Sequence, residues 1–568
     1  MKHTYQIIQK MMRIRLKIFQ NNSITILILI MALGLILRSY MIEKIPNGFA
    51  NDEAAISYQS YSILKTGKDT WGNMLPLTSF KDFGEHLPVL TVYAMIPSIF
   101  LLGLNELSTR LSHALISTLT IFLVYLISQQ LFNKKRISYI ASFLFAVSPL
   151  SIGWSRFVYE GNFGMFFYLL GIYFYLTSRK KINLISLSLL SFTLTLATYH
   201  IYYVVTPLTI LFFYPLQIGK VLKNKSLTIV IIALCFLFTI YYLLVVESGA
   251  GRERFRQVSI FSSANVVQQL NDEITLCRKT LPELVCKVYY NKPYAYLYEY
   301  SYNYLFHYSP TFLALNGTFL RGVILPVSGI VYPFQLPFFY AGLVFLALRR
   351  NFNSYILIFW SLIYPLANSF TGVGEISRIT HALALFQIVS ALGIYTVYNL
   401  FKIKLHKNLF VSFLIIFACF NMSSFLIKYF AIFPISNSKN ASFAYVELFK
   451  KIALEKNSSI NYFISRDYTG STPEYQARIF VPIAPHAFQN PLRRELLIRK
   501  PENYIDYNRL DNFYFFQNIS EINPRQEDII ILSKNQLQDD YRVLYSIKES
   551  DGSQVLFAVD GASLLNEK

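Results

Sequence analysis

The chain is dominated by long apolar segments that alternate with short polar loops, and this pattern limits the folds open to it. A helix that crosses a membrane needs about 20 mostly apolar residues. The eleven segments that we take to meet this requirement are residues 23–40, 107–132, 137–153, 162–177, 182–198, 202–218, 227–246, 332–348, 355–370, 379–400 and 409–427. A hydrophobic content of 54% with only 15% charged residues agrees with this class. The sequence therefore predicts a polytopic α-helical membrane protein with about 11 transmembrane helices.

The positive charge of the chain falls in clusters between these segments. The net charge is +20, but the lysines and arginines gather after every second segment, for example at 133–136, 179–181 and 402–407. Cytoplasmic loops of membrane proteins carry such an excess of basic residues. We therefore expect no nucleic-acid partner, a cytoplasmic basic N-terminus over residues 1–22, and a C-terminus outside the membrane. No small-residue cleavage site follows residues 23–40, so this segment is expected to be a retained span.

The short apolar segment at residues 88–104 has two possible assignments. It is interrupted by Pro97 and is shorter than a span requires. Counting it as a span would place the basic cluster at 133–136 outside the membrane. We therefore assign it as an interfacial helix.

The composition changes after the last apolar segment. Residues 440–568 carry short apolar runs (NYFIS, ARIFVPI, EDIIIL and QVLFAV) separated by Asn, Asp, Gly and Pro, and a helical pattern covers residues 442–455. Such runs predict strands mixed with one or two helices. We expect three parts: the N-terminus 1–22, a transmembrane domain 23–430 with outer loops 43–106 and 247–330, and an extracytoplasmic α/β domain 431–568.

Polar side chains gather in the loops predicted to face outward. The first loop, directly after the first span, holds most of the acidic ones. The outward-facing set is Asp52, Glu53, Glu85, His86, Arg156, Glu160, Asn162, Tyr199, His200, His307, Glu375, Arg378 and His381. A carboxylate can remove a proton from an attacking hydroxyl, and an arginine can hold a phosphate through paired hydrogen bonds.

Each of these residues also has a purely structural alternative. Asp52 and Glu53 could be first-turn acids that stabilise a helix N-terminus. Arg156 could anchor the chain at the membrane surface. Glu85 and His86 could form a metal site or a substrate contact, or lie in a solvated loop. The histidines could be boundary residues that hydrogen-bond to their neighbours.

Four cysteines divide into two pairs. Cys235 and Cys419 fall within predicted spans, where a thiol packs as a small apolar group. Cys277 and Cys286 lie in the outer loop 247–330, where an extracytoplasmic location favours a disulfide. Two free thiols are the alternative. The spacing does not fit the short cysteine pairs of zinc sites.

Several runs resemble a known family. The runs NDEAAISYQSYSILKTGKDTWGNMLPL, FGEHLP, GLNELSTRLSHAL and SPLSIGWSRFVYEGNFGMFF, with PLANSFTGVGEISRITHALALFQIVSALG, cover about residues 25–400. They resemble the GT-C membrane glycosyltransferases of glycosyltransferase family 39. Within these the chain is most similar to bacterial relatives of protein O-mannosyltransferases and of the aminoarabinose transferases that modify lipid A.

The resemblance implies an inverting transferase of a bacterial cytoplasmic membrane with a polyprenyl-phosphate-linked sugar donor. Its acceptor would be a protein, lipid or glycan outside the membrane. On this template Asp52 would be the general base, supported by Glu53. Arg156 and Arg378 would bind the lipid phosphate, and the substrate would also contact Glu85, His86, Glu160, Tyr199, His200 and His381. No cofactor is certain, and a divalent metal stays possible.

Two features depart from the family pattern. Relatives commonly have Lys-Pro-Pro before the interfacial helix, whereas this chain has Leu87-Pro88-Val89. Tyr202-Tyr203 stands where an arginine often follows the TYH sequence. Another cation must therefore serve the donor phosphate, or the donor site differs.

Two other classes of function stay open on the sequence alone. A transporter or flippase of lipid-linked saccharides would also have about eleven spans. It would more often carry ionisable groups in mid-membrane and an internal repeat. A non-catalytic sensor or assembly protein could use its outer domain to bind a partner, and it would tolerate replacement of Asp52.

Overall fold

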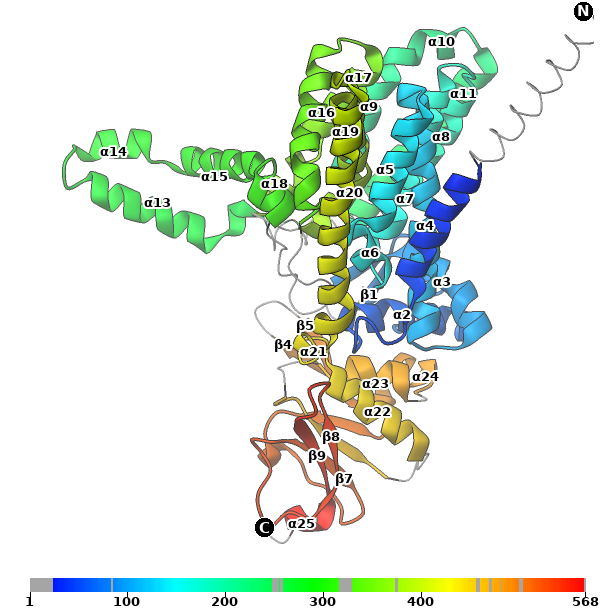
Figure 1. The fold of residues 1–568 in the computed structure, drawn as a ribbon. Coiled ribbons are helices and arrows are strands. Elements are labelled where there is room, and N and C mark those ends of the chain that lie inside the picture. The colour runs from blue at the N-terminus through cyan, green and yellow to red at the C-terminus, as the bar shows by residue number, and fades with distance from the viewer. Residues whose placement is uncertain are drawn as a thin grey trace, which may run out of the picture.

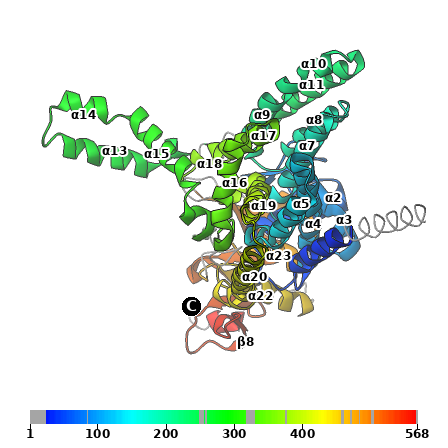
Figure 2. The ribbon, with the colours of Figure 1, turned by 45° about the horizontal axis from the view of Figure 1, so that its top comes forward.

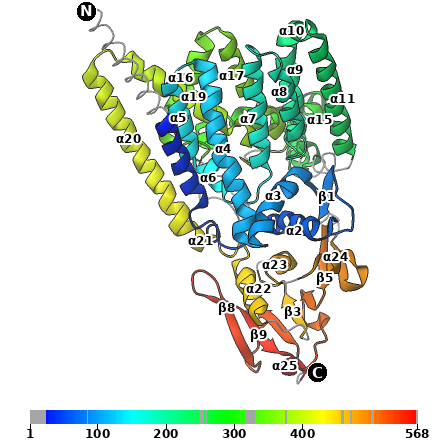
Figure 3. The ribbon, with the colours of Figure 1, turned by 90° about the vertical axis from the view of Figure 1, so that its right-hand side faces the viewer.

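The computed structural model describes residues 24–82, 85–247, 255, 259–315, 329–372, 376–455, 460–468, 472–481, 483–499 and 504–565. Long helices form a bundle at one end of the molecule, and a mixed sheet lies at the other end (Figure 1). The first loop lies between them as a separate layer, which Figure 3 shows from the side. An arm of three helices projects sideways from the bundle (Figure 2).

The bundle has a helix at each of the predicted apolar segments. These helices are Ile24–Ser39, α4 (Glu106–Phe132), α5 (Lys135–Val147) with α6 (Pro149–Ser155), α7 (Gly161–Ser178), α8 (Leu184–Thr195), α9 (Tyr202–Phe213) with α10 (Ile218–Leu222), α11 (Lys225–Glu247), α16 (Leu336–Leu348), α17 (Phe352–Ile363) with α18 (Leu366–Ser369), the 3₁₀ turn η5 (Ile376–Ala382) with α19 (Leu383–Leu400), and α20 (Lys404–Ile427). The helix α20 continues through a π-helical turn into α21 (Phe433–Ser436).

Length and apolarity identify part of this bundle as able to cross a membrane. In the described part of the chain, five continuous helices qualify, or six if the pair α5–α6, bent by 54°, is one span. On α11 and α20 most of the apolar side chains are exposed, as expected for surfaces that face lipid. The chain is thus a multi-pass membrane protein, while the number of eleven spans and their orientation stay predictions.

The first loop folds into two helices and a hairpin. They are α2 (Asn51–Thr66), the antiparallel strands β1 (Ser79–Asp82) and β2 (Glu85–Pro88), and α3 (Val89–Leu102). With 14 residues, α3 is about 21 Å long, shorter than the apolar core of a bilayer. It is therefore the separate short helix that the sequence predicts at residues 88–104.

The C-terminal residues form a seven-stranded sheet with helices packed against it. The strand order is β4-β5-β6-β3-β7-β9-β8, with β3 parallel to both of its neighbours and the other pairs antiparallel. The strands are β3 (Tyr462–Ser465), β4 (Arg494–Arg499), β5 (Tyr504–Leu510), β6 (Phe513–Phe516), β7 (Ile529–Ser533), β8 (Val543–Lys548) and β9 (Gln554–Asp560). The helices are α22 (Phe443–Glu455), α23 (Glu474–Phe480), α24 (Pro485–Gln489) and α25 (Gly561–Leu565).

The prediction of a strand is wrong for one of the four apolar runs. The run ARIFVPI, expected as a strand, forms the end of α23 and the residues that follow it. The reason lies in the tertiary packing. Because α23 packs against both α2 and α22, its apolar side chains are buried on a helix face rather than in the sheet.

The first loop and the C-terminal residues share one apolar core. Ile56 and Tyr58 of α2 are buried in the same cluster as Leu448 of α22 and Phe488 of α24. The Tyr58 hydroxyl donates a hydrogen bond to the carbonyl of Ile483 over 2.7 Å. The sheet and its helices therefore sit directly on the first loop.

The projecting arm consists of α13 (Ala264–Cys277), α14 (Glu283–Tyr289) and α15 (Lys292–Phe306). Cys277 and Cys286 are joined by a disulfide between α13 and α14, the pairing that the sequence favours. Cys235 and Cys419 are free and exposed on the apolar helices α11 and α20.

Candidate functional site

The first turn of α2 carries two adjacent carboxylates with opposite surroundings. Consecutive residues of a helix point about 100° apart, so one can face the protein interior while the next faces solvent. Glu53 is completely buried, whereas the side chain of Asp52 is exposed. Glu53 also accepts a hydrogen bond from the backbone N–H of Ala50, as an acid at the third helical position can.

Glu53 is held by an arginine from the first turns of α4. Arg110 donates from Nε to Glu53 Oε1 over 3.0 Å and from a terminal nitrogen to Oε2 over 2.9 Å, and neither side chain is exposed. A further hydrogen bond reaches Glu53 Oε1 from the backbone N–H of Val158 over 3.1 Å. Two buried charges are stable in this arrangement because each is paired and hydrogen-bonded.

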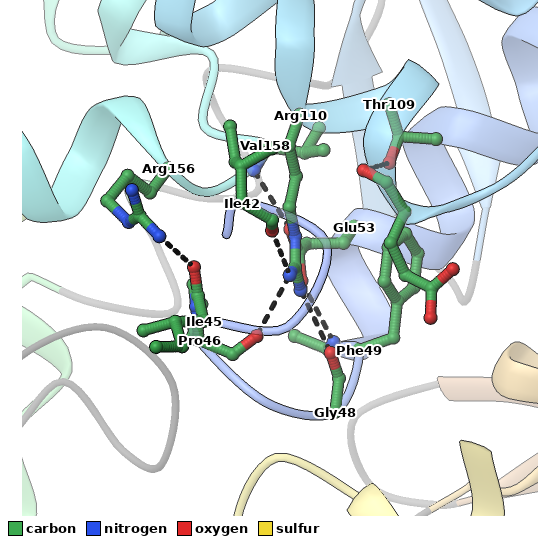
Figure 4. Close-up of polar contacts among 12 residues, drawn as sticks. Ile42, Ile45, Pro46, Gly48, Phe49, Glu53, Thr109, Arg110, Arg156 and Val158 are labelled. Atoms are coloured by element: carbon green, nitrogen blue, oxygen red, sulfur yellow. Dashed lines mark hydrogen bonds and ion pairs between the residues drawn. The ribbon is translucent and has the colours of Figure 1, made fainter. Parts of the chain in front are cut away.

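The same arginine also fixes the chain that leads into α2. Arg110 donates to the carbonyl oxygens of Ile42, Pro46 and Gly48, so residues 42–48 wrap around its guanidinium group (Figure 4). The position of Asp52 is therefore set by a sealed network rather than by a flexible loop.

Arg156 has a similar structural task at the end of the first helix. It donates to the carbonyls of Leu37, Tyr40 and Ile45 over 2.7–3.0 Å, and its guanidinium lies 4.9 Å from the ring centre of Phe430. The side chain is fully buried. A cation at a helix C-terminus satisfies the last carbonyls, and this arrangement leaves Arg156 no exposed atom with which to reach a donor phosphate.

The other acidic residues of the first loop are partly accounted for by internal contacts. Asp69 accepts from the backbone N–H groups of Trp71 and Asn73, and Asp82 pairs with Arg478; both are buried. His86 is half-buried with Nδ1 3.0 Å from Ser79 Oγ. The backbone of Glu85 pairs with Asp82 in the hairpin, but the side chain of Glu85 lies outside the described part of the structure.

Tyr159 and its neighbour Val158 contact three other segments of the chain that carry predicted site residues. The Tyr159 hydroxyl donates to the carbonyl of Ser377, and the Tyr159 ring packs against Tyr199 with centroids 5.3 Å apart. Val158 contacts Glu53, as described above. Glu160, Tyr199, His200 and Arg378 are none of them fully buried. Tyr199 contacts Tyr159 directly, while Glu160 and Arg378 are the chain neighbours of Tyr159 and Ser377.

Two predicted histidines are buried inside the bundle. His381 is completely buried in the bundle, with the rings of Tyr168 and Tyr202 about 6 Å away. His307 is buried and bonded through its two ring nitrogens to the Asn303 carbonyl and the Asn368 side chain. Glu375 lies outside the described residues. Arg378 is half-buried and donates to the carbonyl of Thr371 over 3.5 Å.

The C-terminal residues border the site from the other side. Asn51, next to Asp52, contacts Thr472 and Gln476, and Gln476 also donates to the carbonyl of Phe49 over 2.8 Å. Gly48 has φ of +72°, and an added Cβ would lie 2.1 Å from the carbonyl oxygen of Ala441. The close approach of these two segments therefore requires glycine at this position.

A buried ion pair locks the two layers together. Arg478 of α23 lies 2.9 Å from Asp82 at the end of β1, and the rings of Tyr475, Phe488, Tyr507 and Tyr58 surround its guanidinium. Burial alone would lower the pKa of Arg478, but the charge and hydrogen bond of Asp82, together with Tyr507 and Tyr475, outweigh this effect and raise the pKa above its ordinary value.

Sequence reasoning missed Arg110, Tyr159 and Arg478. The pairing of Arg110 could have been inferred from the sequence. An arginine at the fourth residue of a predicted span has an unfavourable free energy in the membrane unless it is paired inside the protein. The contacts of Tyr159 and Arg478 join residues far apart in the chain and had no such signal. Among the described residues, no three His, Cys, Asp or Glu side chains are grouped as a metal site would need.

Comparison with known proteins gives one family match and several structural matches. Residues 86–243 match the model of the dolichyl-phosphate-mannose-protein mannosyltransferase family. No curated protein matches the chain by sequence. The resemblance expected from the sequence, to GT-C glycosyltransferases, is thereby confirmed for this segment.

The whole chain is similar in fold to ArnT from Cupriavidus metallidurans. The apo structure of ArnT aligns with 94% of this chain and 98% of its own, with 10% identity and a TM-score of 0.51; the structure bound to undecaprenyl phosphate aligns equally well, with the same identity and TM-score. The Archaeoglobus fulgidus oligosaccharyltransferase is also similar, with 15% identity and a TM-score of 0.48 over 83% of this chain. This chain covers 65% of the archaeal enzyme. At these identities the likeness to ArnT shows a shared fold.

Proposed function

We propose that the chain is a membrane glycosyltransferase that moves a sugar from a polyprenyl-phosphate-linked donor to a nucleophile on a protein, lipid or glycan outside the membrane. The observation that carries this proposal is the exposed carboxylate of Asp52, held beside the sealed Glu53–Arg110 pair. The ArnT-like fold and the family match of residues 86–243 support it, as does the ArnT structure with bound undecaprenyl phosphate.

Asp52 would act as the general base. The acceptor oxygen attacks the anomeric carbon of the sugar while the bond from that carbon to the phosphate oxygen breaks, and the electron pair leaves with the polyprenyl phosphate. The proton of the acceptor passes to Asp52. A single displacement of this kind inverts the configuration at the anomeric carbon. A positioned carboxylate contributes about 10²–10⁴-fold to such a step.

Glu53 would position this base without touching the substrate. Its carboxylate already accepts from Arg110, Val158 and Ala50, and none of it is exposed. Its role in this proposal is to hold the first turn of α2 in place.

Of the two arginines predicted to bind the donor phosphate, Arg378 is better supported by the geometry than Arg156. It is only half-buried and lies next to Ser377, which Tyr159 connects to the site, whereas Arg156 is enclosed by carbonyl groups. A guanidinium at this point would neutralise the charge that develops on the departing phosphate. It would replace the lysine that the family pattern has and residues 87–89 lack.

The test is transfer by the purified full chain in proteoliposomes. Polyprenyl phosphates that carry different radiolabelled sugars are supplied with peptide, lipid and glycan acceptors. The proposal predicts labelled product with inverted anomeric configuration and one polyprenyl phosphate released per sugar transferred. Movement of intact lipid-linked sugar across the bilayer, with no product from any donor, would contradict it and favour a flippase.

A further inference from the structure

Among the described residues, the arm of residues 264–306 contacts the bundle at one end only. Its last helix, α15, begins at the far end of the arm and returns to the bundle. There Asn303 donates to the carbonyl of Ser369 over 3.2 Å, and Tyr304 donates to the carbonyl of Leu362 over 2.9 Å. Ser369 is the last residue of α18, at the end of the predicted span 355–370 that is expected to face outward, and Leu362 lies seven residues before it in α17. The root of the arm therefore lies at the level where predicted spans leave the membrane.

The helix α15 has two different faces. Tyr300, Asn303 and Tyr304 turn towards the bundle, with the ring of Tyr300 4.5 Å from that of Phe370. The exposed face carries an apolar stripe at helical spacing: Tyr294, Leu297, Tyr298, Tyr302 and Leu305. Leu297 and Leu305 are 66% and 67% exposed, so no described residue covers this stripe.

The apolar surface continues onto α14 at the far end of the arm. Leu284, Val285, Val288 and Tyr289 are exposed at positions that share one helix face, and Leu284 is 76% exposed. On α13, by contrast, the exposed residues include Gln268, Asn271 and Asp272, and Leu276 near its end is the one large apolar side chain that is exposed. The arm thus has two apolar helices and one that is largely polar on its outside.

The arrangement in space separates these helices. Figure 1 shows α13 on the side of the arm towards the C-terminal sheet, and α14 and α15 on the opposite side. The arm also runs crosswise to the long helices of the bundle. An element that runs crosswise to the spans is parallel to the membrane plane.

We propose that the arm lies on the outer surface of the bilayer, with the exposed apolar side chains of α14 and α15 at the boundary between headgroups and acyl chains. Helices with an apolar face and flanking tyrosines and lysines bind membranes in this way. The far end of the arm, residues 278–292, carries Arg278, Lys279, Lys287 and Lys292 against the single carboxylate of Glu283. This positive end is complementary to anionic phospholipid headgroups.

The disulfide fits this placement. It joins the last residue of α13 to the middle of α14 and so fixes the turn between the polar and the apolar helix. A fixed turn keeps the apolar stripe of α14 on the side of α15.

The test measures the depth of single positions of the full chain in vesicles of phosphatidylethanolamine and phosphatidylglycerol. In a background of Cys235→Ser and Cys419→Ser, the variants Leu297→Cys and Leu284→Cys are labelled with an environment-sensitive fluorophore. The matched control is Gln268→Cys on α13. We expect lipids with a nitroxide on the acyl chain to quench the first two labels severalfold more than the control, and aqueous iodide to quench mainly the control.

The other outcomes overturn the proposal. Equal iodide quenching at all three positions would mean that the arm stands in water. Labels at Leu297 and Leu284 that neither quencher reaches would mean that protein covers the stripe, and cross-linking of these cysteines between chains would identify a second copy as the occupant. A count of free thiols in each variant checks that the disulfide is intact.

Discussion

The first loop and the arm are both insertions between predicted spans, but they are held in opposite ways. The first loop is enclosed between the bundle and the C-terminal sheet and is fixed by buried ion pairs, Glu53–Arg110 and Asp82–Arg478. The arm has exposed ion pairs, such as Arg278–Glu283, and an exposed apolar stripe. Buried charge thus distinguishes the part of the molecule that we propose to carry the chemistry, and exposed apolar surface distinguishes the part that we propose to meet lipid.

The largest effect on stability is expected from breaking the central ion pair of the first loop. Replacing Glu53 by Gln leaves Arg110 charged and unpaired in a site without exposure, which typically costs about 3–5 kcal/mol. We expect a clear fall in the unfolding temperature of the purified protein in detergent.

The neighbouring carboxylate is the control for this change. Asp52→Asn has the same chemistry on an exposed side chain, so its effect on stability should stay within about 0.5 kcal/mol. Equal unfolding temperatures for Glu53→Gln and Asp52→Asn would contradict the conclusion that Glu53 is a buried structural acid and Asp52 an exposed one.

A somewhat smaller effect is expected at the contact between the first loop and the sheet. Arg478→Met leaves Asp82 buried without its ion-pair partner, although the apolar stem still packs among the surrounding rings. Together with Asp82→Asn it forms a double-mutant cycle, for which we expect a coupling energy of about 1–3 kcal/mol. Limited proteolysis should also release the C-terminal residues faster in Arg478→Met.

Additive effects in that cycle would contradict a direct link between the layers. Lys287, which pairs with Glu283 at a solvent-exposed position of α14, supplies the matched control. Lys287→Met with Glu283→Gln should show almost no coupling, because exposed pairs contribute little.

The smallest effect on the bundle is expected from opening the disulfide of the arm. Cys277→Ser with Cys286→Ser should leave the unfolding temperature of the protein nearly unchanged, because the arm shares few contacts with the buried core. The arm itself should become more sensitive to protease, since the covalent constraint on the turn is lost. A large fall in the global unfolding temperature would mean that the arm is part of the cooperative core.

Hydropathy predicted the helical part of the fold well. Apolar segments of sufficient length have few alternatives to helices in a membrane, so helices were found wherever such segments were expected. The short helix at 88–104 followed from its length and from Pro97. The run ARIFVPI was misassigned because short apolar runs fit a strand or a buried helix equally well, and packing against α2 decided between them.

The candidate site was predictable only in part. Asp52 and Glu53 are adjacent and similar in sequence, and what separates them is an arginine 57 positions further along the chain. Arg156 looked like a phosphate ligand because the sequence cannot show that three carbonyls occupy it. The support of the first loop by α23 likewise depends on contacts across about 400 positions.

The most direct test of this account is the rate of sugar transfer by Asp52→Asn, measured per folded protein beside the wild type and Asp272→Asn, an exposed carboxylate on the arm. We expect Asp52→Asn to lose about 10²–10⁴-fold in rate while its unfolding temperature is unchanged, and Asp272→Asn to be as active as the wild type. Wild-type transfer by a folded Asp52→Asn protein would contradict the assignment of Asp52 as the base.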